Sequence, residues 1–492
     1  MFPTLYEINT RIWLKQFGPK ASLADIPDQY WEAMKEKGID YVWLMGIWMT
    51  TESSIEKCCF HPDLIQEYDR VSPNWQKEDI TGSPYAIEDY VLDKRLGQRK
   101  DLVSVRRQLN RIGLRLILDF VPNHFNVDSN LVKKHPKVFL QVTSDQFYHD
   151  TDTFFQKGDQ YFAHGKDPYF AAWSDTAQIN YLDPEAHNFM RAKLSSVADY
   201  CDGVRCDMAM LILPDIFENT WGQISSQRYP VDFWTHAIAE VKKKNPEFIF
   251  MAEAYWDTEW RLHTLGFDYT YDKKMLDFLV HDQIWDLKKH LTGLMDYHKQ
   301  TVRFIENHDE DRSLRALGEC KAKAAAILYN TLPGMRLHYD GQWTGERVRY
   351  PVQVGTYFTP QTCICAIRSE LSEQALPCSC MKVFYDQLLK ITSKDIFKLG
   401  QWKLLNEDST NPNISMIWTY LNKQVLVAIN LTANHVESSV QVPGQWEGTY
   451  IIDILNQVDQ PNYVTKTDTD LKITLPPYKG CILSDQKSKL IP

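Results

Sequence analysis

Segments with strand-like and helix-like patterns alternate along the first ~390 residues of the chain, as in parallel βαβ units. Short apolar runs bounded by Gly, Asn and Asp predict eight strands. These are Leu5–Trp13, Tyr41–Ile47, Leu114–Val121, Gly203–Met208, Phe248–Ala252, Tyr269–Tyr271, Thr301–Ile305 and Arg336–Tyr339. Eight such units close most economically into an α/β fold of the (β/α)8 TIM-barrel type.

The segments between these runs carry the three- and four-residue apolar spacing of amphipathic helices. One such stripe consists of Leu102, Val105, Leu109 and Ile112. Similar stripes occur in IPDQYWEAMKEKG, VDFWTHAIAEVKKK and VFYDQLLKIT. The helices are therefore expected to cover the outside of the barrel.

Two regions depart from this alternation and divide the chain. Residues 125–180 are polar and rich in aromatic side chains and predict an inserted subdomain after the third strand. From residue 396 to 492 short alternating runs replace the helical period, which predicts a C-terminal antiparallel β-sandwich. The barrel is assigned to residues 1–124 and 181–395.

Composition and charge restrict the kinds of molecule that the protein is expected to bind. The chain has 492 residues, 44% of them hydrophobic, and a formal net charge of −10. A charge of this sign argues against a nucleic-acid partner, because phosphate binding needs clustered Lys and Arg. No apolar run approaches the ~18 residues that span a membrane, and no leader pattern precedes the first strand. A cytoplasmic protein with reduced cysteines is expected, and its oligomeric state stays open.

The most concentrated cysteines form two C-x-C pairs, Cys363 with Cys365 and Cys378 with Cys380. Structural zinc sites generally use C-x₂-C pairs, so a metal site is the less favoured alternative to free or occasionally bridged thiols. We predict neither a metal nor a cofactor.

Polar residues recur at the ends of the predicted strands, where TIM-barrel enzymes carry their catalytic groups. They are Asp119, Asn123 and His124 after the third strand, Arg205 and Asp207 on the fourth, Glu253 after the fifth, and Asn307, His308 and Asp309 after the seventh. A single Asp at such a place is usually a helix cap or turn residue. Carboxylates at three matching strand ends instead indicate one shared site.

Such a set suits glycoside hydrolysis, which needs a carboxylate nucleophile and a carboxylic acid that protonates the leaving oxygen. Arg205 and Asp207 are two residues apart on a strand, so their side chains share one face. The arginine is therefore expected to keep the Asp207 carboxylate ionised and oriented. Aromatic residues of the insertion would add surfaces on which sugars stack.

Four short motifs at these positions resemble the α-amylase family, glycoside hydrolase family 13. They are DFVPNH at Asp119–His124, GVRCD at Gly203–Asp207, Glu253 at its strand end, and ENHD at Glu306–Asp309. The resemblance implies that Asp207 is the nucleophile, Glu253 the general acid/base and Asp309 a transition-state stabiliser. It also implies that Arg205, His124, His308 and Tyr85, the last in SPYAIEDY, bind the attacked sugar. Retention in this family implies carboxyl groups roughly 5–5.5 Å apart.

The chain also departs from the family. Met210 and Leu211 stand where typical α-amylases have Lys-His after the nucleophile, and only Asn123 is evident of the family's calcium ligands. The predicted function is a retaining hydrolase that cleaves a small α-glucoside or a malto-oligosaccharide. One alternative is an α-glucosyltransferase or phosphorylase that uses sucrose or another α-glucoside on the same site. A non-catalytic binding relative is disfavoured because all three carboxylates and Arg205 are present.

Overall fold

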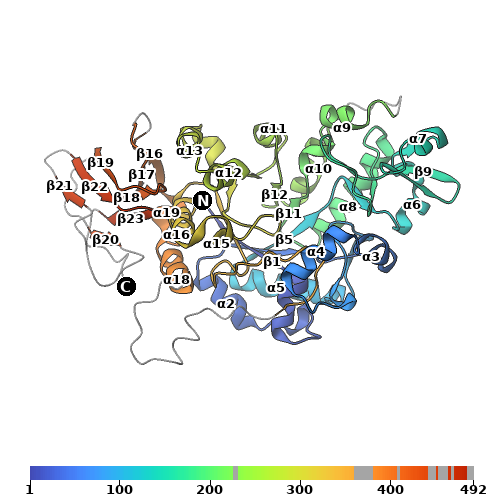
Figure 1. Ribbon diagram of the computed structural model, residues 1–492, viewed down its shortest axis with the longest axis horizontal. Coiled ribbons are helices and arrows are strands. Elements are labelled where there is room, and N and C mark those ends of the chain that lie inside the picture. Colours follow the sequence, from blue (N-terminus) through green and yellow to red (C-terminus); the bar gives the residue numbers. More distant parts are fainter. Residues whose placement is uncertain are drawn as a thin grey trace.

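In the computed structural model, the described residues are 1–224, 231–358, 381–406, 410–441, 450–452, 464–466 and 470–484. Their first part forms a closed parallel barrel with the strand order β1-β15-β14-β13-β12-β11-β5-β2. Its strands are β1 (Thr4–Asn9), β2 (Tyr41–Met45), β5 (Arg115–Phe120), β11 (Gly203–Cys206), β12 (Ile249–Ala252), β13 (Tyr269–Tyr271), β14 (Thr301–Arg303) and β15 (Met335–Tyr339). The predicted TIM barrel is confirmed (Figure 1).

The predicted strands match this barrel closely, with one clear difference at its start. Strand β1 ends at Asn9 rather than at Trp13, because the chain turns there into the short helix α1 (Thr10–Trp13). The four helix-like stripes form α2 (Asp28–Glu36), α5 (Arg99–Ile112), α10 (Phe233–Lys244) and α18 (Met381–Thr392). Their apolar faces, such as Leu102, Val105 and Leu109 of α5, are buried.

The register of the barrel strands brings polar residues of different strands together. In β11, Arg205 lies opposite Asp119 of β5 and Met251 of β12. Below this layer the barrel interior is apolar, with Leu5, Trp43, Ile117, Met251, Val302 and Leu337 among its buried side chains. Polar side chains therefore gather at the carboxyl ends of the strands, above an apolar core.

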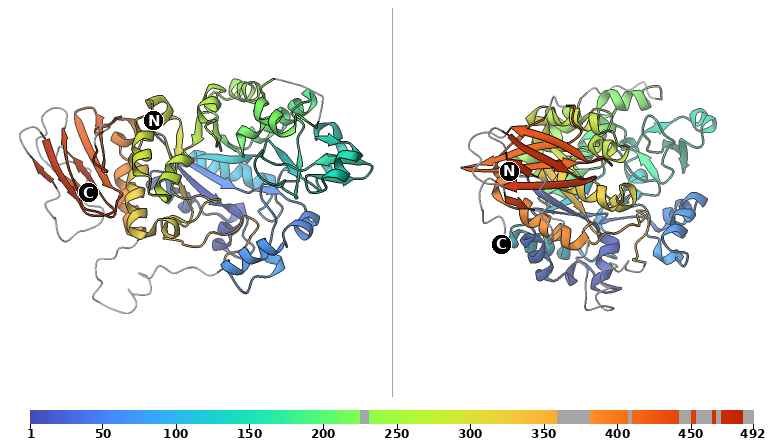
Figure 2. Two further views of the ribbon diagram at one scale, coloured as in Figure 1. Left: turned by 45° about the horizontal axis from the view of Figure 1, so that its top comes forward. Right: turned by 60° about the vertical axis from the view of Figure 1, so that its left-hand side comes forward.

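The insertion between β5 and β11 contains short antiparallel strands rather than a further βα unit. Strand β6 (His124–Asn126) pairs with β10 (Thr176–Gln178). A separate three-stranded sheet has the order β7-β9-β8, formed by Gln141–Val142, Gln160–Ala163 and Phe154–Lys157, with helices α6 (Asn130–Lys134) and α7 (Ser144–His149) beside it. Figures 1 and 2 place this part at the end of the molecule opposite the C-terminal sheets.

The C-terminal part contains two antiparallel sheets, which confirms the predicted sandwich (Figure 2). One sheet has the order β16-β17-β18-β23-β20 and the other β19-β22-β21. Their bounds are β16 Gln401–Leu404, β17 Ile414–Tyr420, β18 Lys423–Asn430, β19 Val436–Gln441, β20 Tyr450–Ile452, β21 Val464–Lys466, β22 Asp470–Leu475 and β23 Lys479–Ser484. The sandwich packs on helix α16 (Gly318–Thr331) of the barrel, where the Trp418 indole donates to the carbonyl of Thr331 at 2.7 Å.

A buried arginine holds the loops above β1 and β2 in place. Arg11 of α1 donates to the carbonyl oxygens of Gly46 at 3.0 Å, Trp48 at 3.1 Å and Gly82 at 2.8 Å. It is 4% exposed, and burial lowers the pKa of its guanidinium to about 10. Because Gly82 precedes Tyr85 by three residues, Arg11 fixes the loop that carries Tyr85 over the barrel mouth.

Replacing Arg11 by Met keeps most of the side-chain volume but leaves three carbonyl groups without a donor. Each unsatisfied buried carbonyl costs about 1–3 kcal/mol, so we expect Arg11→Met to lower stability by at least about 2 kcal/mol. The measurement is the thermal and urea unfolding midpoint. The control is Arg111→Met, whose arginine is 64% exposed in an ion pair with Asp28 and should cost less than about 1 kcal/mol. Equal shifts in the two variants would contradict the anchoring role.

Candidate active site

The centre of the site is the guanidinium of Arg205, which β11 directs into the mouth of the barrel. Its side chain is 1% exposed. Nη1 lies 2.7 Å from Oδ1 of Asp207 and 3.8 Å from Oδ1 of Asp119, and Nη2 lies 2.9 Å from Oε2 of Glu253 and 4.0 Å from Oδ2 of Asp309. One cation thus brings together carboxylates from four strand ends, including the three that the sequence singled out.

Aromatic rings enclose the same guanidinium. Its central carbon lies 5.3 Å from the ring centroid of Trp43, 5.1 Å from that of Tyr85 and 5.8 Å from that of Tyr271. The hydroxyl of Tyr271 also accepts from Nε at 3.3 Å. These rings restrict the arginine to one position and reduce the water around it, which strengthens its interactions with the carboxylates.

Asp207 directly follows β11, and its backbone N–H donates to the carbonyl of Phe120 at 2.9 Å. A 3₁₀ turn spans Ala209–Ile212 after it, and helix α9 follows at Pro214–Trp221. The cap position of that turn belongs to Met208, in the left-handed region at φ 42°. Asp207 therefore does not cap a helix, and its carboxylate is available to the site.

Glu253 directly follows β12 and is held at both carboxyl oxygens. Oε2 accepts from the backbone N–H of Met208 at 2.7 Å, and Oε1 accepts from the hydroxyl of Tyr255 at 2.8 Å. The strained backbone of Met208 thus points its N–H at Glu253, one residue after Asp207. This bond links the two carboxylates through the backbone as well as through Arg205.

Asp309 belongs to a chain of groups that crosses the barrel mouth. Its Oδ2 lies 3.0 Å from Nε2 of His308, whose Nδ1 lies 2.5 Å from Oε1 of Glu7 in β1. The Asp309 side chain is 42% exposed, whereas those of Asp207 and Glu253 are 9% and 5% exposed. Asp309 is thus the carboxylate of the cluster that faces the solvent side.

The carboxylates outnumber the cations around them, and their pKa values reflect this. Burial raises the pKa of Asp207 and of Glu253, with Arg205 opposing it in both, and raises that of Asp119 to about 6. We had expected Arg205 to keep Asp207 readily ionised. Arg205 does favour the ionised form of Asp207, but desolvation of the buried carboxylate outweighs this effect, so the net shift of the pKa is upward.

At the other end of the cluster, the pKa values of Asp309 and His308 shift so that the charged form of each is favoured. Against the cost of desolvation, His308 lowers the pKa of Asp309 to about 2. Although burial disfavours the imidazolium, Asp309 and Glu7 raise the pKa of His308 to about 10. At neutral pH His308 is an imidazolium and Asp309 is ionised.

The structure places Tyr85 within the carboxylate cluster, whereas His124 lies beside the cluster. The Tyr85 hydroxyl lies 2.7 Å from Nε2 of His308, and the two rings stack with centroids 5.3 Å apart. His124 instead packs on the ring of Trp173 and lies 3.4 Å from the side chain of Asn123. Within the described residues, no hydrogen bond or ion pair joins His124 to Asp207, Glu253 or Asp309.

The possible metal ligands do not converge in the described part of the chain. There, no group of three or more His, Cys, Asp or Glu side chains is arranged to hold a metal ion. The side-chain oxygen of Asn123 accepts from the amide of Gln178 at 3.0 Å. Cys363, Cys365, Cys378 and Cys380 lie outside the described residues. Among the helices that are described, none has the length and apolar character needed to cross a membrane.

The sequence interpretation missed three residues that complete the site, namely Glu7, Tyr255 and Tyr271. Glu7 had a detectable signal, because a charged residue inside the apolar run LYEIN must find a buried partner. Asp119 was noted at its strand end but was not included among the site residues. Nothing in the sequence indicates that Tyr255 bonds back to Glu253, because this contact depends on the turn after β12.

Comparisons with known proteins agree with this architecture. Residues 31–353 match the model of the alpha-amylase catalytic domain. Alpha-amylase 2 of Dictyoglomus thermophilum is 26% identical over 291 residues, which are 56% of this chain and 46% of that protein. The chain thus spans about half the length of that relative.

Solved structures show the same fold over nearly the whole chain. The alpha-amylase from H. orenii has a TM-score of 0.69 at 20% identity and is covered over 99% of both chains. The maltogenic alpha-amylase AmyB from Thermotoga neapolitana has a TM-score of 0.66 at 19% identity, with 98% of both chains covered. With the catalytic-domain match covering well over half of its residues, the chain belongs to the α-amylase family, glycoside hydrolase family 13.

Proposed function

We propose that this protein is a retaining glycoside hydrolase that cleaves α-glucosidic bonds in a small α-glucoside or a malto-oligosaccharide. The observation that carries the proposal is that Asp207 and Glu253 bind the two terminal nitrogens of one guanidinium. Nη1 of Arg205 lies 2.7 Å from Oδ1 of Asp207, and Nη2 lies 2.9 Å from Oε2 of Glu253. Retaining glycosidases require two neighbouring carboxyl groups, one to attack and one to protonate.

Asp207 attacks the anomeric carbon, and Glu253 gives its proton to the leaving oxygen as the glycosidic bond breaks. The product is a glucosyl ester of Asp207 and a free leaving group. A water molecule then gives its proton to Glu253 and attacks the anomeric carbon of the ester. The bond between this carbon and Asp207 breaks, which releases glucose and restores both carboxyl groups. Two displacements at one carbon retain the anomeric configuration.

The proton that the first step needs is held by the pair of carboxyl groups. Asp207 and Glu253 both have raised pKa values, and one guanidinium cannot neutralise two carboxylates. The raised pKa of Glu253 favours its protonated form, and in that form it is the acid of the first step. Asp207 reacts in its ionised form, and this carboxylate stabilises the positive charge that develops on the ring in the transition state.

The remaining site residues bind the attacked sugar in this proposal. Asp309, ionised and exposed, accepts from sugar hydroxyls and stabilises the developing positive charge. Arg205 and His308 donate to the same ring, and Tyr85 stacks on it. His124 is assigned to the edge of this subsite, beside Tyr85, although it touches none of the three carboxylates.

The experiment that tests the proposal is a chromatographic screen of maltose, maltotriose, sucrose, trehalose and isomaltose, with and without an added acceptor or inorganic phosphate. We expect free glucose as the main product from at least one substrate. Dominant glucosyl transfer or glucose phosphate would replace the hydrolase by the transferase or phosphorylase alternative. Absence of turnover on every α-glucoside would overturn the proposal.

Asp207→Asn is expected to reduce turnover by about 10³-fold or more, because an amide cannot form the glucosyl ester. The measurement is kcat on the best substrate of the screen, with the melting temperature recorded to show that the fold is intact. The matched control is Asp215→Asn, a 60% exposed carboxylate paired with Arg261 on the surface. Near-normal turnover by Asp207→Asn would contradict the assignment.

Glu253→Gln tests the acid/base role of Glu253 separately from the nucleophilic role of Asp207. This variant should lose most activity on a sugar leaving group but far less of its glycosylation rate on α-glucosyl fluoride, because fluoride leaves without a proton. Added azide should then give α-glucosyl azide by attack on the Asp207 ester. Equal losses on both donors, with no azide product, would remove Glu253 from the acid/base role.

The Glu7–His308–Asp309 chain gives a pH dependence of stability. The pKa of His308 is about 10 in the folded protein and about 6.5 in the unfolded chain. Its stabilising contribution is therefore complete below pH ~6.5 and is lost as the pH rises to about 10. We expect the difference in melting temperature between the wild type and His308→Gln to shrink from pH 6.5 to pH 10. A difference that stays constant over this range would show that the imidazolium is not the source.

A further inference from the structure

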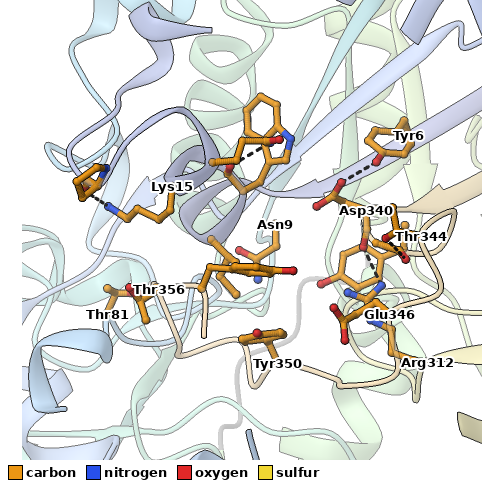
Figure 3. A pocket seen from close by; sticks show the side chains of 18 of the residues that line it. Tyr6, Asn9, Lys15, Thr81, Arg312, Asp340, Thr344, Glu346, Tyr350 and Thr356 are labelled. Atoms are coloured by element: carbon orange, nitrogen blue, oxygen red, sulfur yellow. Dashed lines mark hydrogen bonds between the residues drawn. The ribbon is translucent and has the colours of Figure 1, made fainter. Parts of the chain in front are cut away.

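A second cavity, of about 810 Å³, lies on the same rim of the barrel as the carboxylate cluster. It lies between the ends of β1 and β15 and the segment that follows β15, and Asp207, Glu253 and Asp309 are not among the residues that line it. Figure 3 shows Asn9 and Tyr350 between Lys15, Thr81 and Thr356 on one side and Asp340, Glu346 and Arg312 on the other.

The lining combines aromatic rings with planar polar groups. Six aromatic residues take part, namely Tyr6, Trp13, Tyr339, Trp343, Tyr350 and Tyr357. Tyr357 is 44% exposed, and its ring stacks on that of Tyr350 with centroids 5.9 Å apart. An exposed ring backed by a buried one is a firm platform for the apolar face of a sugar.

Two carboxylates of the cavity, Asp340 and Glu346, are held by hydrogen bonds within the protein, and each keeps one further oxygen for a ligand. Oδ1 of Asp340 accepts from the Tyr6 hydroxyl at 2.6 Å, and Oε1 of Glu346 accepts from the backbone N–H groups of Arg347 and Val348 at 3.0 Å each. Glu346 is 9% exposed. The second oxygen of each carboxylate remains an acceptor for ligand hydroxyls.

Asn9 supplies a donor that the described residues do not satisfy. It is 6% exposed and lines the cavity, and its amide nitrogen is buried without a hydrogen-bond partner in the described part of the chain. Leaving such a donor unpaired is unfavourable, and a rotation of the Asn9 amide towards the cavity would let a ligand accept from it.

The charges of the lining exclude a strongly charged ligand. Lys15, Arg95 and Arg312 face the same space as Glu78, Asp340 and Glu346. Arg312 is already committed to Glu306 at 2.9 Å, and Arg95 forms an ion pair with Asp93. A phosphate would meet the carboxylates, and an ammonium group would meet Lys15 and Arg312, so a neutral ligand is favoured.

We propose that this cavity is a second carbohydrate-binding site, which holds a neutral oligosaccharide through Asn9, Asp340, Glu346 and the Tyr357 platform. The class of ligand follows from the lining, whereas the choice of an α-glucan among oligosaccharides rests on the proposed function. Binding here requires no chemistry at Asp207, so the two proposals can fail separately.

The test uses the full-length Asp207→Asn protein titrated with maltotriose by calorimetry, which prevents turnover. We expect two binding events, and adding Tyr357→Ala should weaken one of them by about tenfold while the other is retained. The matched control is Tyr148→Ala, an exposed tyrosine of α7 that does not line the cavity. A single event that only Tyr357→Ala removes would support the cavity and count against sugar binding at the carboxylate cluster.

Asn9→Ala, introduced into the Asp207→Asn protein, distinguishes a role of Asn9 in ligand binding from a role in the stability of the fold. Maltotriose affinity at the second site should fall about three- to tenfold, whereas the melting temperature without sugar should not fall, because the amide has no partner to lose. No binding, a single event that Tyr357→Ala leaves unchanged, or a preference for glucose 6-phosphate or putrescine over maltotriose would each overturn the proposal.

Discussion

The site depends on one constraint, which is that a single desolvated guanidinium must serve several carboxylates. Arg205 is nearly inaccessible and touches Asp207 and Glu253 directly, with Asp119 and Asp309 slightly further away. Without this cation the carboxylates would repel each other in a medium of low dielectric constant, and they would bind additional protons. With it, burial still raises the pKa values of Asp207 and Glu253, because the shared guanidinium offsets only part of the desolvation of each carboxylate.

The barrel meets this constraint because its parallel strands end at one rim. The four carboxylates come from the ends of four different strands. Asp119 lies within β5, Asp207 and Glu253 directly follow β11 and β12, and Asp309 lies in the loop after β14. The left-handed backbone at Met208 adds a short link between Asp207 and Glu253. Met210 and Leu211, which replace the family's Lys-His, are 0% and 3% exposed and pack in the turn after this link. At these two positions the chain has apolar packing instead of polar groups that would reach a leaving sugar.

The sequence allowed the fold and the central carboxylates to be predicted for identifiable reasons. Strand ends follow from apolar runs and turn residues, and Arg205 with Asp207 follows from two-residue alternation on a strand. The direction of the pKa of Asp207 could not be predicted, because it depends on how many carboxylates share the guanidinium and how deeply they are buried. Glu7 was missed because its partner, His308, is about 300 residues away in the chain. His124 was placed by its motif, but the pairing of β6 with β10 directs it towards Trp173.

The loop after β14 connects the two polar regions of the rim. Oε2 of Glu306 accepts from the backbone N–H of Ser313 at 2.8 Å, and its Oε1 lies 2.9 Å from Arg312. This carboxylate closes the loop of residues 306–313. His308 and Asp309 lie on the side of the loop that faces Arg205. Arg312 lies on the side that faces the cavity, and its guanidinium stacks on the ring of Tyr339. Glu306 thus ties Arg312, which lines the cavity, to the same loop that carries Asp309 towards the guanidinium. Because Glu306 is buried and bonded through both carboxyl oxygens, it fixes the backbone of this loop between the two polar regions.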